Sequence, residues 1–154
     1  MEEDRTSPDQ EFKRIVSLCE EVITGFELDP ANQLMESEED CRVWGLRKGS
    51  ANILLIIRRM GDDNHVHIVS PILQMPDLDL EDFFRRLLEL NHEELIGCAF
   101  AVRGDQVCVT ADRMTWGLDR FELEETLACV AEAADRFDNE LSEEFGAEML
   151  GSES

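Results

Sequence analysis

The stretch Gly97–Asp112 reads GCAFAVRGDQVCVTAD, and it predicts a β-hairpin. Gly104-Asp105 suits a two-residue turn with glycine first. Because side chains alternate along a strand, this register places six apolar residues on one face, in the pairs Val102–Val107, Phe100–Val109 and Cys98–Ala111. The opposite face then carries mostly small side chains: Ala99, Ala101, Arg103, Gln106, Cys108 and Thr110. Such a face is unusual for a sheet surface open to water, so the sequence raises the question of what covers it.

Three further strands are expected before the hairpin, at 41–47, 51–59 and 65–70. Lys48-Gly49-Ser50 and Gly61-Asp62-Asp63-Asn64 separate them, and such short connections favour an antiparallel meander. Pro71 is expected to end the third strand, because proline has no N–H to donate to the ladder. The middle strand is apolar on both faces, with one face formed by Ile53, Leu55 and Ile57 and the other by Leu54 and Ile56.

Three helices complete the pattern. The first begins after Ser7, where Ser7, Pro8 and Gln10 form a capping box, and it ends at Gly25. The second begins at Asp79 and ends near Asn91; its expected buried stripe is Leu80, Phe83, Phe84, Leu87 and Leu88, and Leu90 lies off it. The third runs from Asp119 to Phe145 with an apolar seam at Leu123, Leu127, Val130, Ala134, Phe137 and Leu141.

The element order is therefore α-β-β-β-α-β-β-α, which belongs to the α+β class. Residues 27–40 read as an acidic loop with at most one helical turn. We expect one domain over residues 1–154, with an ordered core of about 7–146 and a frayed tail. The second face of the sheet is either covered by another chain or by the long last helix folding back over it; the sequence leaves both alternatives open.

The charge and hydropathy of the chain exclude some classes of function. The net charge is −22, with 13 acidic and 3 basic residues in 1–40, 11 and 9 in 41–116, and 12 and 2 in 117–154. This charge opposes binding to nucleic acid or to anionic membranes. The longest apolar run, Ile53–Ile57, is too short to span a bilayer, and the N-terminus lacks the order of a signal peptide, so a cytoplasmic protein is expected.

No motif for chemistry stands out, and we expect no enzyme activity and no cofactor. The 5 cysteines are odd in number and show no C-x-x-C spacing, which argues against a disulfide framework or a zinc site. His65 and His67 could share one strand face as a metal pair, but no further ligand follows at a familiar spacing. A hydrolase or metal protein using these two histidines is the least favoured hypothesis.

The segment Leu87-Leu88-Glu89-Leu90-Asn91, followed by Gly97–Val109 and a long helix containing Ala134-Asp135, resembles the YbjN family of small bacterial proteins, annotated loosely as sensory transduction regulators. That family is similar in fold to the class I type III secretion chaperones. The resemblance implies a twisted antiparallel five-stranded sheet with three helices. It also implies a homodimer that binds polypeptide segments, often extended, across exposed hydrophobic surface, and it brings no catalytic residues.

The leading hypothesis is thus a non-enzymatic, dimeric protein-binding module, chaperone-like or an adaptor. The alternatives are a signalling regulator that senses a small ligand beneath the long helix, and a dedicated secretion chaperone. The candidate partner-binding residues are Trp44, Leu54, Ile56, Ala99, Ala101, Cys108 and Thr110. The candidate dimer residues are Phe84, Leu88 and Leu90.

Overall fold

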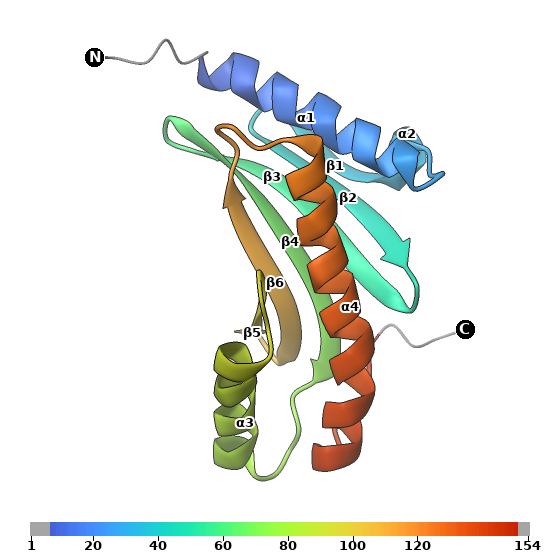
Figure 1. Cartoon of the computed structure of the whole chain (residues 1–154), viewed down its shortest axis with the longest axis vertical. Coiled ribbons are helices and arrows are strands. Elements are labelled where there is room, and N and C mark those ends of the chain that lie inside the picture. Colours follow the sequence, from blue (N-terminus) through green and yellow to red (C-terminus); the bar gives the residue numbers. More distant parts are fainter. Residues whose placement is uncertain (1–6, 151–154) are drawn as a thin grey trace.

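A computed structural model describes residues 7–150 of the chain. Its helices and strands are α1 (Pro8–Gly25), α2 (Pro30–Gln33), β1 (Leu34–Glu38), β2 (Cys41–Lys48), β3 (Ala51–Met60), β4 (Asp63–Gln74), α3 (Leu80–Glu93), β5 (Ala99–Arg103), β6 (Gln106–Met114) and α4 (Arg120–Phe145). The six strands form one antiparallel sheet in the order β1-β2-β3-β4-β6-β5, drawn in Figure 1. The α+β class is confirmed, but with six strands and four helices instead of five and three.

The β5–β6 hairpin has the expected register. Phe100 pairs with Val109, and Val102 with Val107, around a turn in which Gly104 has a φ of +61°. Two expectations about its apolar face were wrong. β5 begins at Ala99, so Cys98 precedes the strand, and Val102 is 49% exposed because it lies next to the turn, where few neighbours can cover it.

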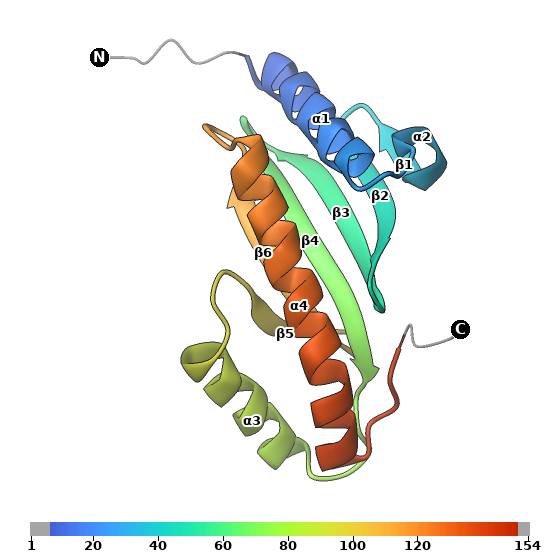
Figure 2. The ribbon, with the colours of Figure 1, turned by 45° about the vertical axis from the view of Figure 1, so that its right-hand side comes forward.

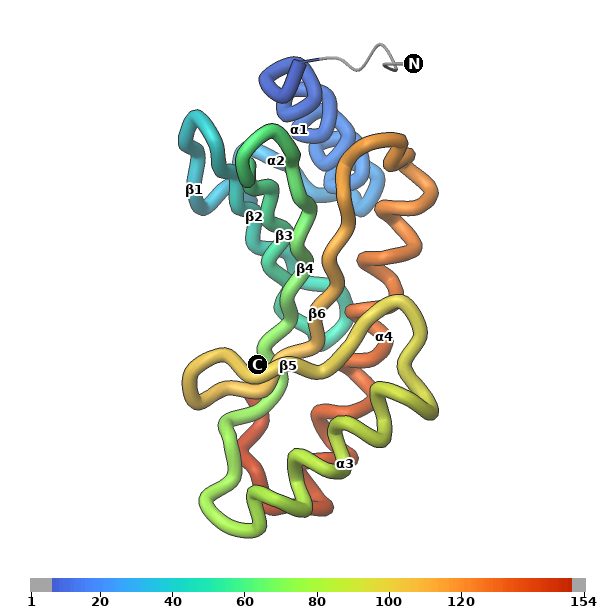
Figure 3. Tube along the Cα trace, turned by 90° about the vertical axis from the view of Figure 1, so that its left-hand side faces the viewer, coloured from blue at the N-terminus to red at the C-terminus, as the bar shows by residue number. Residues whose placement is uncertain are grey.

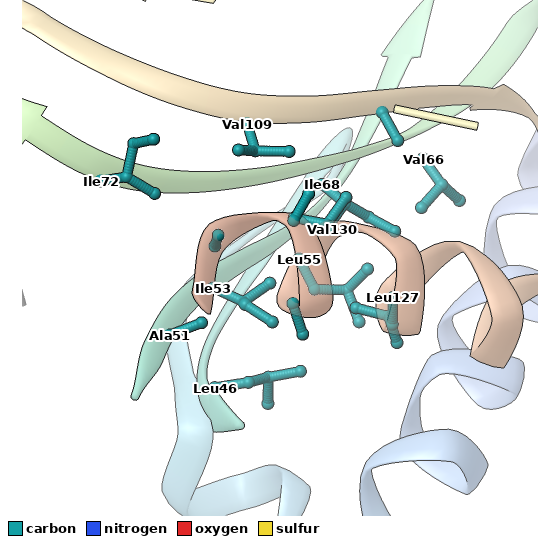
Figure 4. Packing of buried hydrophobic residues seen from close by; sticks show 14 of the residues in the cluster. Leu46, Ala51, Ile53, Leu55, Val66, Ile68, Ile72, Val109, Leu127 and Val130 are labelled. Carbon is teal, nitrogen blue, oxygen red and sulfur yellow. The ribbon is translucent and has the colours of Figure 1, made fainter. Parts of the chain in front are cut away.

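The core lies between one face of the sheet and the helices α1 and α4, and it extends to the buried residues of α3, which are Phe83, Leu87 and Leu90. From β3 this face contributes Ile53, Leu55 and Ile57, and Figure 4 shows side chains of the sheet meeting Leu127 and Val130 of α4. All six residues of the expected α4 seam are buried. Burial of a large aliphatic side chain stabilises a fold by about 1.5–3 kcal/mol, so this layer dominates the stability of the fold.

Both long helices begin as the sequence predicts. The Ser7 side chain accepts from the backbone N–H of Gln10 at 3.2 Å, and the Asp119 side chain accepts from that of Glu122 at 2.8 Å. Arg14 of α1 then donates to the backbone oxygens of Thr115 and Leu118, at 2.7 and 3.0 Å. These bonds tie α1 to the connection between β6 and α4.

The position of α4 decides between the two alternatives for the second face of the sheet. α4 packs on the same face as α1, and Figure 1, Figure 2 and Figure 3 show both helices on one side of the sheet. The 26-residue helix is about 39 Å long at about 1.5 Å per residue. It uses this length to cross the strands once and does not fold over the opposite face, which the described helices leave uncovered.

The acidic segment 27–40, expected as a loop, supplies the sixth strand. Pro30–Gln33 forms the short helix α2, and Leu34–Glu38 forms β1, which pairs with β2 through Glu36–Val43 and Glu38–Cys41. All five β1 residues are exposed. A strand without buried side chains carries no alternating apolar pattern, which explains why the sequence did not reveal it.

β4 continues to Gln74, four residues past the expected end. The ladder with β6 shifts register between Pro71 and Leu73, and a bulge of this kind accommodates proline within a strand. The segment after α4, expected to fray, pairs with this extension: the N–H of Gln74 donates to Glu148 O, and that of Leu150 to Ile72 O, both at 2.8 Å.

Helix α3 buries a different stripe from the expected one. Phe83, Leu87 and Leu90 are its buried residues, whereas Leu80 and Leu88 are exposed and Phe84 is half-buried. Helical spacing permits either stripe, and contact with β5 and α4 selects the one that includes Leu90. For example, the Phe83 ring packs edge-on against Phe145 at 5.0 Å.

A matched pair of variants tests this orientation of α3. Leu90 is fully buried and Leu88 is 68% exposed, so Leu90→Ala is expected to lower the free energy of unfolding by about 2–5 kcal/mol. Leu88→Ala is expected to change it by about 0.5 kcal/mol or less. Urea denaturation measures both, and equal losses would contradict the orientation.

Candidate functional site: the uncovered face of the sheet

The uncovered face is defined by the outward side chains of five strands: Val43, Gly45, Leu54, Ile56, Val69, Pro71, Ala99, Ala101, Cys108 and Thr110. Their register follows from the strand pairing. Gly45, Leu54, Val69, Thr110 and Ala99 stand opposite one another in turn and form one continuous row across β2, β3, β4, β6 and β5. The face is therefore apolar or small along its whole width.

Sequence reasoning placed six residues on this face, and the strand pairing brings all six together: Leu54, Ile56, Ala99, Ala101, Cys108 and Thr110. It missed Val43, Gly45, Val69 and Pro71. Val43 and Gly45 could have been found, because the turn at Lys48-Gly49-Ser50 sets the register of β2 against β3. Val69 could also have been found, because it lies within the strand expected at 65–70, and only Pro71 depended on the continuation of β4.

Two of the candidate residues are not accessible. Trp44 points to the opposite face, where it is 2% exposed within the core, because it alternates with the outward Val43 and Gly45. It therefore does not belong to this surface. Cys108 does lie on the uncovered face, but it is 1% exposed, and burial raises the pKa of its thiol. The accessible apolar atoms of the face are those of its half-buried members.

A shallow hollow opens at one end of this face. It measures about 380 Å³ and is lined by Met35, Gly45, Leu54 and Pro71, among others. The sulfur of Met35 would lie only 2.8 Å from a Cβ atom placed on Gly45, so a larger residue at this position would require the Met35 side chain to shift. Methionine adapts to differently shaped apolar partners, which suits the rim of a binding surface.

The charge of the uncovered face differs from that of the helices. α4 alone carries nine acidic and two basic residues, whereas Arg47, Arg58 and Arg103 lie on outward positions of the sheet and are exposed. His67 is held by Asp112, with 2.6 Å between Nδ1 and Oδ1. Strand pairing also places Glu36, Glu38 and Asp112 on this face, so it carries charges of both signs, whereas α4 is strongly acidic.

The two edges of the sheet differ in their access to another strand. At the β5 edge, Asn91 of α3 accepts from the Phe100 N–H at 2.7 Å and donates to the Phe100 carbonyl oxygen at 3.5 Å. The side chain of Asn91 therefore occupies the groups that a further strand would use. At the opposite edge, β1 is exposed along its whole length and acidic at Glu36 and Glu38.

The proposed dimer residues divide into two groups. Leu90 lies in the core and cannot contact a second chain. Phe84 and Leu88 instead line a hollow of about 500 Å³ on the outer side of α3. With Leu80 one turn earlier, they form an apolar ridge along the helix, which we call the α3 ridge.

The structure gives little support to the alternative sites. Among residues 7–150, no group of three or more His, Cys, Asp or Glu side chains is arranged to hold a metal ion, His65 and His67 included. A hollow beside α4 measures about 250 Å³ and is lined mainly by Phe26, Leu28, Leu46, Ile53 and Leu127. This is below the size range of most small-molecule sites. Within the same residues, no helix combines the length and apolarity needed to cross a bilayer.

Residues 17–150 match the family described as T3SS (YopN, CesT) and YbjN peptide-binding chaperone 1. The chain belongs to this family, which confirms the resemblance stated from the sequence. The family description names chaperones, which is consistent with a non-enzymatic protein. A search among curated protein sequences found no significant match.

The solved structures with a similar fold include protein–protein complexes, one of which is described as a chaperone–effector complex. The ExsC–ExsE complex matches with a TM-score of 0.64 at 16% identity, over 84% of this chain and 95% of that chain. The HopA1–SchA chaperone–effector complex matches with 0.61 at 10% identity, over 85% and 98%. The heterodimeric ExoU–SpcU complex from the type III secretion system of Pseudomonas aeruginosa matches with 0.55 at 14% identity, over 78% and 94%. At these identities the likeness establishes the fold.

Asn91→Ala tests whether this side chain closes the β5 edge. Loss of two hydrogen bonds to Phe100 is expected to lower the free energy of unfolding by about 1–2 kcal/mol. It is also expected to speed hydrogen exchange at the Phe100 amide far more than at amides in the centre of the sheet. Unchanged exchange at Phe100 would show that other groups protect this edge.

Proposed function

We propose that this protein is a non-enzymatic, chaperone-like module that binds a segment of another protein on the uncovered face of its sheet. The observation that carries the proposal is the continuous row of apolar and small side chains on a face that the described helices leave open. Membership of a peptide-binding chaperone family supports it, as does the fold shared with a chaperone–effector complex. A dedicated role in secretion is a narrower form of the same proposal.

The chemistry of the face indicates how such a segment binds. Leu54 and Ile56 offer apolar contact area, while Gly45, Ala99 and Ala101 permit a backbone to approach closely. Burial of apolar surface drives association. Hydrogen bonds along the free β1 edge can fix an extended segment in register, as in other cases of strand addition. The acidic helices repel acidic proteins and limit nonspecific contacts.

The α3 ridge is the surface we propose for a homodimer. Leu88 is 68% exposed and Phe84 is half-buried, and such an apolar ridge is best removed from water by a second copy of the same helix. This assignment uses two of the three dimer candidates and leaves the uncovered face of each chain accessible to a partner.

Partner binding is tested with charged variants on two sides of the molecule. The tagged protein is used to capture partners from a lysate of its native organism, and a near-stoichiometric partner is identified by mass spectrometry. Leu54→Asp or Ile56→Asp is expected to reduce the amount of that partner retained by about tenfold or more. Phe121→Asp serves as the matched control, because Phe121 is exposed on α4. Equal retention by all variants would refute the uncovered face as the site, and the absence of any partner would favour the small-ligand alternative.

Dimer formation is tested separately by light scattering on a sizing column. The native protein is expected to have twice the mass of the chain, and Leu88→Asp is expected to give a folded monomer, since two carboxylates would meet at the ridge. Ile96→Asp, at another exposed apolar position, is the control and should remain dimeric. A native monomer, or a Leu88→Asp dimer, would exclude this interface.

A further inference from the structure

Two of the five cysteines lie together at a hollow that the proposed function does not use. All five fall within the described residues; Cys19, Cys41 and Cys108 are buried, while Cys98 and Cys129 are half-buried. Cys98 immediately precedes β5, and Cys129 lies in the middle of α4. Both line a hollow of about 290 Å³, together with Leu95, Ile96, Ala133 and Phe137 among others.

The geometry brings the two thiols within reach of each other. Cys98 Sγ lies 3.7 Å from the backbone oxygen of Cys129. Cys129 Sγ in turn lies 3.6 Å from the position of a Cβ atom built on Gly97, the residue next to Cys98. Each sulfur therefore points at the backbone of the other segment, and a local shift of one segment can join them.

The segment that carries Cys98 is held at its two ends, and within it Leu95 and Cys98 pack against the core while Ile96 does not. Arg136 of α4 forms an ion pair with Glu94, and Asn91 holds Phe100. Between these anchors Ile96 is 87% exposed, and Gly97 has a φ of +77°, a conformation that glycine adopts without strain. These contacts keep the segment beside α4. Gly97 lacks a side chain, so the backbone next to Cys98 can change its dihedral angles with little steric cost.

We propose that Cys98 and Cys129 form a reversible dithiol–disulfide site, oxidised by a disulfide of the glutathione class. One cysteine thiolate attacks a sulfur of glutathione disulfide and releases one glutathione thiolate. The other cysteine thiolate then attacks the mixed disulfide at the protein sulfur and releases the second glutathione. Two electrons pass to glutathione disulfide, and the two thiol protons are taken up by the two glutathione thiolates or by solvent.

Oxidation at this site would fix the start of β5 to α4. The bond would join residues 31 positions apart in the sequence, and a crosslink over such a loop restricts the unfolded chain. Burial raises the pKa of the Cys98 thiol to about 11, so this cysteine reacts slowly at neutral pH and faster as the pH rises. This inference stands independently of the proposed function.

The experiment treats the reduced, folded protein with glutathione disulfide at about pH 8.5, where the thiolate fraction is raised, and maps disulfides by mass spectrometry after proteolysis. The expected result is a Cys98–Cys129 linked peptide, with loss of two free thiols and a rise in the unfolding midpoint by about 5 °C or more. Cys98→Ser and Cys129→Ser are each expected to abolish the linked peptide and the rise in midpoint. Cys108→Ser is the control and should retain both.

Three results would overturn the proposal: five thiols still free in the folded, treated protein; glutathione retained on Cys98 or Cys129 without an internal bond; or a crosslink found only between two chains. Circular dichroism of each serine variant verifies that it is folded. A variant that fails this check is replaced by the corresponding alanine variant, so that the mapping remains decisive.

Discussion

The fold depends on one central strand that is apolar on both faces. β3 directs Ile53, Leu55 and Ile57 into the core beneath α1 and α4, and it directs Leu54 and Ile56 to the opposite side. A sheet with one solvated face normally alternates apolar and polar residues. Since α4 packs on the same face as α1, the described helices of this chain do not cover the second apolar side of β3. The apolar side of β3 that faces away from the helices is the basis of the proposed partner binding.

Much of this arrangement follows from residue pattern alone. The capping residues Ser7 and Asp119, the register of the β5–β6 hairpin and the seam of α4 are all strong local signals, and the structure has them. The predictions made from these signals are correct because each signal depends only on residues that are close in the sequence. The members of the uncovered face on β3, β5 and β6 could be predicted for the same reason, since alternation along a strand fixes which way a side chain points.

Most of the features that could not be predicted depend on contacts distant in the sequence. β1 is the exception, since it pairs with the adjacent strand β2 but has no buried side chain that would reveal it in the sequence. Pro71 predicted the end of a strand. In the structure a bulge accommodates Pro71 within β4, and the segment after α4 pairs with the strand beyond it, through Leu73 and Met149. Leu90 and Leu88 are two residues apart on one helix, and only the position of α3 against β5 and α4 decides which is buried. Trp44 is a similar case, because tryptophan is common both in binding interfaces and in protein cores. The alternation of side chains along β2 places it in the core.

The unequal edges of the sheet limit how the protein can assemble. Because Asn91 occupies the hydrogen-bonding groups of Phe100, a further strand on the β5 side would have to displace both of these bonds. At the β1 side, a second copy would bring Glu36 and Glu38 against the same residues of its mate. Both edges therefore disfavour strand pairing between copies of this chain, which opposes growth of the exposed sheet by self-association.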